Sequence, residues 1–184
     1  MIEVERKFRL SAQEKQHIYN ILQQKDKKAK DVEQNDQVLL QGINSFAEFR
    51  QGMPIVRLRS EDGNTILTYK RSINDSGDSI EHELEINNPN SMLAILQEMD
   101  YRIVTTVKKR RFEAQEGYAT FALDTVDMLG DFLEIEILVD SEDKIPDAIQ
   151  NIMKISKDLG LSESQLESKK YDQLIAALSS GDTQ

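Results

Sequence analysis

Residues 2–10 read Ile2-Glu3-Val4-Glu5-Arg6-Lys7-Phe8-Arg9-Leu10. Apart from Arg6, the even positions are apolar, and the odd positions are all charged. Because side chains of a β-strand alternate between its two faces, this segment predicts a strand with one apolar face and one charged face. The same alternation returns in later segments, so we expect a sheet in which several strands contribute to one charged face.

That charged face is unusual because charges of one sign recur at every second residue. The recurrences are Glu3 and Glu5, then Arg57 and Arg59, then Glu81, Glu83 and Glu85, and finally Glu134 and Glu136. Same-face neighbours on a strand lie about 7 Å apart, so like charges repel there unless counter-charges or water intervene. One interpretation is a solvent-exposed face with cross-strand Glu–Arg pairs. The other places these side chains inside a barrel, where they could hold an anion together with a divalent cation.

The remaining pattern predicts an α+β protein. Further strands are predicted at 32–40, 44–50, 54–60, 64–71, 79–87, 102–114, 117–126 and 131–139, with turns at 61–64 and 74–78. Helices are predicted from Ser11, from Pro89, from Pro146 to Gly160, and over 162–178. The hairpin-length connections favour an antiparallel sheet, and about eight strands could close into a barrel.

Composition narrows the functional classes. The 184 residues are 39% hydrophobic and 30% charged, with a net charge of -10, which suits one domain. We expect that domain to span residues 1–178, followed by a short tail at 179–184. The absence of cysteine excludes disulfides and thiolate chemistry, and two histidines argue against a histidine-rich zinc site.

The acidic balance argues against nucleic-acid binding, although a basic cavity can coexist with an acidic exterior. The chain has no run of about 18 apolar residues and no charged leader followed by an apolar stretch. We therefore expect a soluble cytoplasmic protein that binds neither nucleic acid nor membranes.

A series of short motifs resembles a known family. The motifs are Glu3-x-Glu5-x-Lys7, Val56-Arg57-Leu58-Arg59, Leu67-Thr68-Tyr69-Lys70, Glu81-His82-Glu83-Leu84-Glu85, Lys108 to Arg111, Leu123-Asp124, and Gly130-Asp131-Phe132-Leu133-Glu134-Ile135-Glu136. In this order, from residue 2 to about 175, the chain resembles the CYTH superfamily of triphosphate tunnel metalloenzymes. That superfamily includes class IV adenylate cyclases, thiamine triphosphatases and inorganic triphosphatases. The resemblance implies an eight-stranded antiparallel β-barrel with flanking helices, a triphosphate bound in its tunnel, and a requirement for Mg²⁺ or Mn²⁺.

The resemblance also implies a role for each matching residue. The implied metal ligands are Glu3, Glu5, Asp124, Glu134 and Glu136, although Asp124 could instead orient a ligand. The implied catalytic and phosphate-binding residues are Lys7, Arg57, Arg59, Lys70, Lys109 and Arg111, and the substrate-binding set adds Glu83, Glu85 and Lys169. The family's Lys-x-Arg pattern fits residues 108–111 in two registers. We prefer Lys109 with Arg111, which share the phase of Ile103 and Val107.

Two departures from the motifs of this family bear on the type of reaction. Many cyclase-like members follow the Tyr-Lys pair with Gly-Pro, where this chain has Arg71-Ser72, and Lys169-Lys170 replace the serine expected before Tyr171. These differences favour a metal-dependent hydrolase of thiamine triphosphate, tripolyphosphate or a nucleoside triphosphate, in which metal-bound water is the nucleophile. The alternatives are an adenylate cyclase that converts ATP to cyclic AMP and pyrophosphate, and a non-catalytic module that binds triphosphate or polyphosphate. The protein could act as a monomer or as a homodimer.

Overall fold

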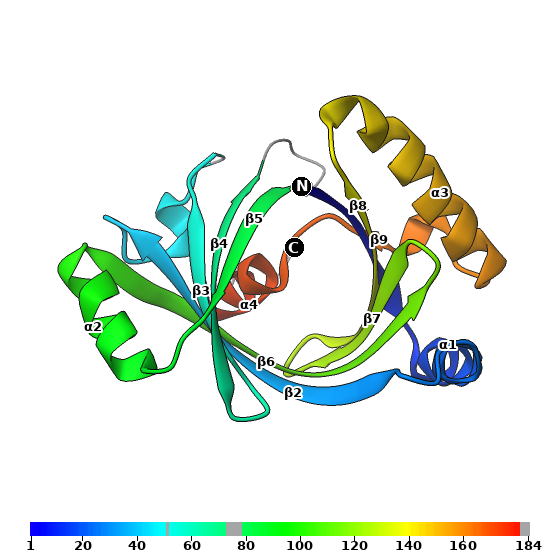
Figure 1. The fold of residues 1–184 in the computed structure, drawn as a ribbon, viewed down its shortest axis with the longest axis horizontal. Coiled ribbons are helices and arrows are strands. Elements are labelled where there is room, and N and C mark those ends of the chain that lie inside the picture. The colour runs from blue at the N-terminus through cyan, green and yellow to red at the C-terminus, as the bar shows by residue number, and fades with distance from the viewer. Residues whose placement is uncertain (51, 73–78, 181–184) are drawn as a thin grey trace.

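The strands close into an antiparallel barrel (Figure 1). The computed structural model describes residues 1–50, 52–72 and 79–180. Within these ranges the barrel consists of β1 (Ile2–Leu10), β2 (Lys30–Gln41), β3 (Ile55–Glu61), β4 (Asn64–Ser72), β5 (Ser79–Glu85), β6 (Tyr101–Glu116), β7 (Ala119–Val126) and β8 (Gly130–Val139). Neighbours follow the order β5-β4-β3-β2-β6-β7-β8-β1, and β1 pairs with β5 to complete the circle. The predicted eight-stranded antiparallel barrel is confirmed.

The joint between β1 and β5 is short. Strand β1 pairs with β8 along its whole length, whereas it meets β5 only through Ile2 and Glu3. Further along the same edge, the two-residue strand β9 (Leu166–Glu167) pairs with Lys7 and Phe8. A segment from the C-terminal part of the chain therefore continues the wall of the barrel along β1, beyond Ser79 at the start of β5.

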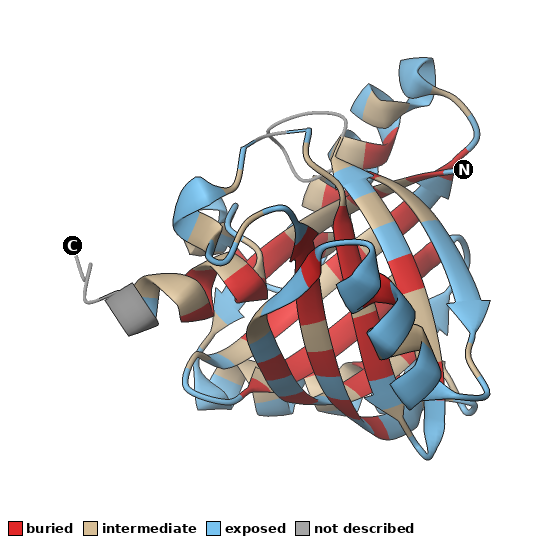
Figure 2. Ribbon diagram, turned by 90° about the vertical axis from the view of Figure 1, so that its left-hand side faces the viewer, coloured by how far each residue is buried: buried red, intermediate tan, exposed pale blue. Residues whose placement is uncertain are grey.

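Of the helices among the described residues, three cover the outer, apolar face of the barrel, whereas α4 (Tyr171–Ser180) packs against a separate core that includes Val38 and Val107. Helices α1 (Ala12–Lys25) and α3 (Ile145–Asp158) pack on β1, β6, β7 and β8, where Phe8, Phe121 and Ile135 form a core with Ile18 and Ile152. Helix α2 (Pro89–Glu98) covers a smaller core that includes Leu39 and Val56. Figure 2 shows buried residues recurring along the strands of the wall. Since these apolar side chains face the helices, the alternate, charged side chains face the interior.

Capping and turn residues in the sequence account for several boundaries of the helices and strands. The Ser11 hydroxyl and the Glu14 carboxylate form the predicted capping box at the start of α1. Asp62 and Gly63 both have positive φ, 49° and 84°, as a tight hairpin turn between β3 and β4 requires. Gly160, with φ 85°, follows α3 and ends it. None of the helices in the described ranges is long and apolar enough to span a membrane.

Two predicted elements were wrong. Residues 44–50 do not form a strand, because Phe46–Glu48 is a short 3-10 helix whose Phe46 packs on Phe49. The predicted helix at 162–178 begins only with α4 (Tyr171–Ser180), since Glu163–Gln165 is a 3-10 helix and the next two residues pair with β1. The predicted turn at 74–78 and the tail residues 181–184 lie outside the described residues, and α4 extends to Ser180.

Candidate active site

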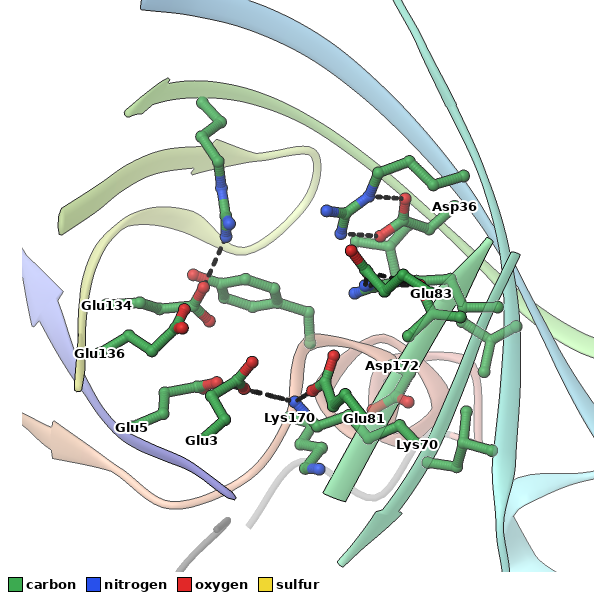
Figure 3. Close-up of a pocket in the computed structure, with 18 of the residues that line it drawn as sticks. Glu3, Glu5, Asp36, Lys70, Glu81, Glu83, Glu134, Glu136, Lys170 and Asp172 are labelled. Atoms are coloured by element: carbon green, nitrogen blue, oxygen red, sulfur yellow. Dashed lines mark hydrogen bonds and ion pairs between the residues drawn. The ribbon is translucent and has the colours of Figure 1, made fainter. Parts of the chain in front are cut away.

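Charged side chains line a cavity of about 470 Å³ inside the barrel (Figure 3). Every barrel strand except β7 contributes to this lining. Its acidic members are Glu3, Glu5, Asp36, Glu81, Glu83, Glu113, Glu134, Glu136 and Asp172, and its basic members are Lys7, Arg57, Arg59, Lys70, Lys109, Arg111 and Lys170. The cavity has the volume of an ordinary small-molecule site. Of the two interpretations of the charged face, the structure shows the one that places it inside the barrel.

Carboxylates gather around Lys70 in one part of the cavity (Figure 3). The Lys70 Nζ atom lies 2.8 Å from Glu3 Oε1 and 3.9 Å from Glu5 Oε2, and it also contacts Glu81. Although burial by itself lowers the pKa of Lys70, these carboxylates raise it above its ordinary value. The ammonium group is therefore charged and sits among three acidic side chains.

One ammonium group does not balance this cluster. Burial raises the pKa of Glu3 to about 9; Lys70 opposes the rise, and neighbouring carboxylates, including Glu136, add to it. Burial together with Glu5 and Glu81 raises the pKa of Glu136 to about 7. Raised carboxyl pKa values mean that the site resists further negative charge and attracts protons or cations.

The donors of this cluster fit a hard divalent cation. All of them are carboxylate oxygens, which Mg²⁺ and Mn²⁺ prefer, and they already surround a positive charge on Lys70. In the described part of the chain, no three acidic or histidine side chains are close enough to one another to bind one metal ion without moving. Glu3, Glu5 and Glu136 are the residues that would hold the cation.

Glu134 and Asp124, also predicted as ligands, are engaged by basic groups. Arg111 donates two hydrogen bonds to Asp124, of 2.8 and 2.6 Å, and one of 2.5 Å to Glu134. Lys109 Nζ lies 3.1 Å from Asp124 Oδ2, and Lys7 Nζ lies 3.4 Å from Glu134 Oε1. Asp124 has no exposed surface and stands behind the cavity lining. Of its two predicted roles, this geometry favours orienting other groups over binding metal.

Lys109 and Arg57, two further basic residues of the cavity, differ in their surroundings. Burial and the neighbouring Arg111 guanidinium lower the pKa of Lys109 to about 8, although Asp124 opposes this change. Arg57 donates to Thr68 Oγ1 at 3.1 Å, while its Nε atom is buried without a hydrogen-bond partner. Lys109 and Arg111 both line the cavity, in agreement with the preferred register of residues 108–111.

Asp36 is a site residue that the sequence did not reveal. Its two carboxylate oxygens accept hydrogen bonds of 2.7 and 2.8 Å from Nε and Nη2 of Arg59. Burial favours a higher pKa for Asp36, yet the hydrogen bonds and charge of Arg59, together with Arg57, lower it. The sequence does not single out Asp36, because its same-face neighbours Gln34 and Val38 are uncharged and the pattern of like charges at every second residue is missing there.

The start of α4 also reaches the cavity. Lys170, Tyr171 and Asp172 belong to the lining, whereas Lys169, the predicted lysine, does not. Lys7 Nζ instead donates to the Lys169 backbone carbonyl at 3.3 Å. Lys170 Nζ lies 3.4 Å from Ser72 Oγ. The sequence does show a lysine pair before Tyr171, but which lysine points inward depends on how α4 begins.

The structure brings most of the predicted site residues together. The predicted residues that line the cavity are Glu3, Glu5, Lys7, Arg57, Arg59, Lys70, Glu83, Lys109, Arg111, Glu134 and Glu136. Asp124 supports the lining from behind, and Glu85 and Lys169 lie outside it. Glu85 shares a face with Glu81 and Glu83, but it is exposed near the end of β5.

Comparison with known proteins finds a family match over most of the chain. The sequence pattern of the CYTH domain family matches residues 1–171. A candidate adenylate cyclase of Methanocaldococcus jannaschii is 28% identical over 69% of this chain and 74% of its own length. The adenylate cyclase CyaB of Aeromonas hydrophila is 32% identical over 48% of this chain and 46% of its own length. A solved structure from Pyrococcus horikoshii superposes with a TM-score of 0.76 and 26% identity, covering 94% of this chain and 98% of the other.

Proposed function

This chain belongs to the CYTH domain family, and from that premise we propose that it is a metal-dependent hydrolase of a triphosphate bound in the barrel cavity. The family includes adenylate cyclases and triphosphatases, and its enzymes generally depend on metals. The observation that carries the proposal is the arrangement of charge. One cavity holds a carboxylate cluster, which suits a divalent cation, next to a group of lysines and arginines, which suits phosphate oxygens.

The basic residues would bind and orient the triphosphate. Arg59 and Arg111 are each held by a buried aspartate, so their guanidinium groups need little reorganisation when an anion binds. Lys7 and Lys109 add positive charge from β1 and β6. Such fixed charges stabilise the negative charge that moves onto the leaving phosphate during phosphoryl transfer.

A bound Mg²⁺ or Mn²⁺ would polarise phosphoryl oxygens and lower the pKa of bound water. The carboxylates Glu3, Glu5 and Glu136 would hold this ion and place its charge beside the basic group. Lys70, whose ammonium group lies among the carboxylates, would keep the cluster together in the absence of substrate. The enclosing wall would limit the access of bulk water to the bound triphosphate.

Hydrolysis is favoured over cyclisation by the chemistry of the lining. A cyclase must bind the adenine and ribose of ATP, usually through apolar or aromatic contacts. Among the described residues, Tyr171 supplies the only aromatic ring of the lining, and the amino groups of Lys7 and Lys109 lie over that ring. The lining also includes the apolar residues Met1, Val38, Ile55, Val107 and Leu138, but charged side chains outnumber them, so a compact and highly charged substrate such as tripolyphosphate suits it best.

Adenylate cyclase activity is the second candidate. The observation in its favour is that both curated relatives are named for that activity. The two reactions would use the same phosphate-binding residues, and they differ in whether water or the 3′-hydroxyl of ATP attacks. A purely binding protein is disfavoured, because an anion binder has little use for the carboxylate cluster around Lys70.

Phosphorus NMR tests the proposal directly. The protein is incubated with Mg²⁺ or Mn²⁺ and, in separate samples, with tripolyphosphate, thiamine triphosphate or ATP, and products are followed over time. We expect orthophosphate to appear, fastest from one of the first two substrates, and not from a parallel sample of Glu5→Gln protein. Pyrophosphate and cyclic AMP from ATP would establish a cyclase instead. Binding without turnover would establish a binding protein.

A further inference from the structure

Tyr171 enters the cavity from α4 and not from a strand of the barrel. Its ring is 7% exposed, and the edge of the ring packs against Phe132, with 5.1 Å between the ring centroids. The Nζ atoms of Lys7 and Lys109 lie 4.2 and 5.1 Å from its ring centroid. Both distances are within the range of cation–π attraction. One aromatic ring therefore lies close to two ammonium groups, one from β1 and one from β6.

The hydroxyl group of Tyr171 is buried without a partner. Among the described residues, three buried side-chain polar atoms have no hydrogen bond: Gln34 Oε1, Arg57 Nε and Tyr171 Oη. Buried polar groups are normally paired, so each of these needs a reason. Arg57 and Tyr171 both belong to the cavity lining, and both unpaired atoms can donate. Two unused donors in one cavity match a ligand that is rich in acceptor oxygens.

We propose that Tyr171 is a substrate-contacting residue whose hydroxyl donates a hydrogen bond to a phosphoryl oxygen of the bound triphosphate. Its ring holds the ammonium groups of Lys7 and Lys109 toward the same ligand. The inference rests on the proposed function, since it takes a triphosphate as the occupant of the cavity. It adds a donor that none of the strand motifs contains.

The chain before Tyr171 supports this position. Strand β9 pairs with Lys7 and Phe8 on β1, and the Lys169 carbonyl accepts a hydrogen bond from Lys7 Nζ. The same lysine therefore contacts the backbone just before Tyr171 and the ring of Tyr171 itself. Because β9 fixes the approach of the chain to α4, the tyrosine is held in place by pairing with the barrel wall.

The test compares Tyr171→Phe with Tyr118→Phe. Phenylalanine keeps the ring and removes only the hydroxyl, and Tyr118 is 62% exposed at the turn between β6 and β7. Calorimetry with tripolyphosphate in the absence of a divalent cation, so that the ligand is not cleaved, should show about 10- to 100-fold weaker binding for Tyr171→Phe, as expected for one hydrogen bond to a charged group. Tyr118→Phe should bind like the wild type.

Thermal unfolding separates this role from a structural one. Removing an unpaired buried hydroxyl should leave the melting temperature of Tyr171→Phe unchanged or raised. Weaker binding without lower stability supports the inference, and unchanged binding overturns it. A wild-type protein that binds tripolyphosphate without cleaving it would refute the proposed hydrolysis, while the binding comparison still decides the role of Tyr171. A wild-type protein that binds no triphosphate would refute both.

Discussion

The carboxylates in and directly behind the cavity lining fall into two groups according to their partners. Asp36 and Asp124 are almost fully buried, each accepts two hydrogen bonds from one arginine, and the pKa of each is lowered despite burial. Glu3 and Glu136 lack such partners, and their pKa values are raised to about 9 and about 7. Divergent pKa values in one site commonly separate chemical roles. We infer that the first group orients basic residues and the second group attracts cations.

Replacement of Glu5 by glutamine tests the carboxylate cluster around Lys70, to which Glu3 also belongs. The variant keeps the shape of the side chain but removes one charge from the carboxylate cluster. We expect kcat to fall by at least about 10- to 100-fold, the loss typical even of outer-shell changes at metal sites. Circular dichroism should show an unchanged fold, and Glu33→Gln, on the exposed face of β2, should retain activity. A normal rate for Glu5→Gln would remove the metal-binding role of this residue.

Replacement of Asp36 by asparagine tests the first group. The variant leaves the buried Arg59 guanidinium without its counter-charge, and breaking a buried pair in this way costs about 3–5 kcal/mol. Urea unfolding at pH 7 should show this loss, and the exposed Asp31→Asn variant on the same strand should not.

The same pair predicts a pH dependence with a definite sign. Because the pKa of Asp36 is lower in the folded state, its stabilising contribution is complete above the unfolded pKa of about 3.9. That contribution is lost as the pH falls through the folded value. The difference in unfolding free energy between wild type and Asp36→Asn should therefore be constant near neutral pH and shrink as the pH falls below about 4. A difference that does not shrink at these acidic pH values would show that Asp36 does not act through its charge.

At the scale of elements, the β3–β4 hairpin supplies Arg57, Arg59 and Lys70 to the cavity. Its register places Arg57 opposite Thr68 and Ile55 opposite Lys70, and all four residues line the cavity. A slip of one residue would turn these side chains to the outer face. The turn at Asp62 and Gly63 therefore determines which side chains of the hairpin face the cavity.

Gly63→Ala should weaken this element without altering the site. Gly63 has φ 84°, a conformation that costs an ordinary residue about 1–2 kcal/mol. Chemical denaturation should reveal a loss of that size, while tripolyphosphate affinity of the folded protein stays normal. Asn64→Ala, the next residue, has no positive φ and serves as the matched control. Equal stability of the two variants would contradict this account of the turn.

At the scale of the whole molecule, an acidic protein encloses a partly basic cavity. The net charge is -10, yet lysines and arginines from β1, β3, β4 and β6 converge on the interior. The low dielectric constant inside the barrel strengthens the interaction between charges, so an anion site and a cation site in one cavity should influence each other. A triphosphate and a divalent cation should thus bind more strongly together than apart.

Thermal unfolding measures this coupling. A ligand at 100 times its Kd stabilises the folded state by about 2.7 kcal/mol. We expect Mg²⁺ with tripolyphosphate to raise the melting temperature by more than the sum of the two separate effects. Glu5→Gln should lose the excess while keeping part of the tripolyphosphate effect. Strictly additive shifts in the wild type would argue that the two ligands occupy independent sites.

The sequence by itself determined which residues share a face. Alternation is a local property of extended chain, so Glu3 with Glu5, and Arg57 with Arg59, could be grouped without a structure. Turn and cap residues such as Gly63 and Ser11 likewise act within a few residues. The motif series was enough to indicate the family, the barrel and most of the charged side chains that line the cavity.

Tertiary structure decided what the local pattern could not. Whether the charged face met solvent or an interior depended on closure between β1 and β5, which are far apart in sequence. Asp36 became part of the site only through pairing with Arg59, and Tyr171 only because β9 pairs with β1 before α4 begins. Such contacts join distant segments, and their free energy depends on the whole barrel. For that reason, no local spacing of residues in the sequence predicts these contacts.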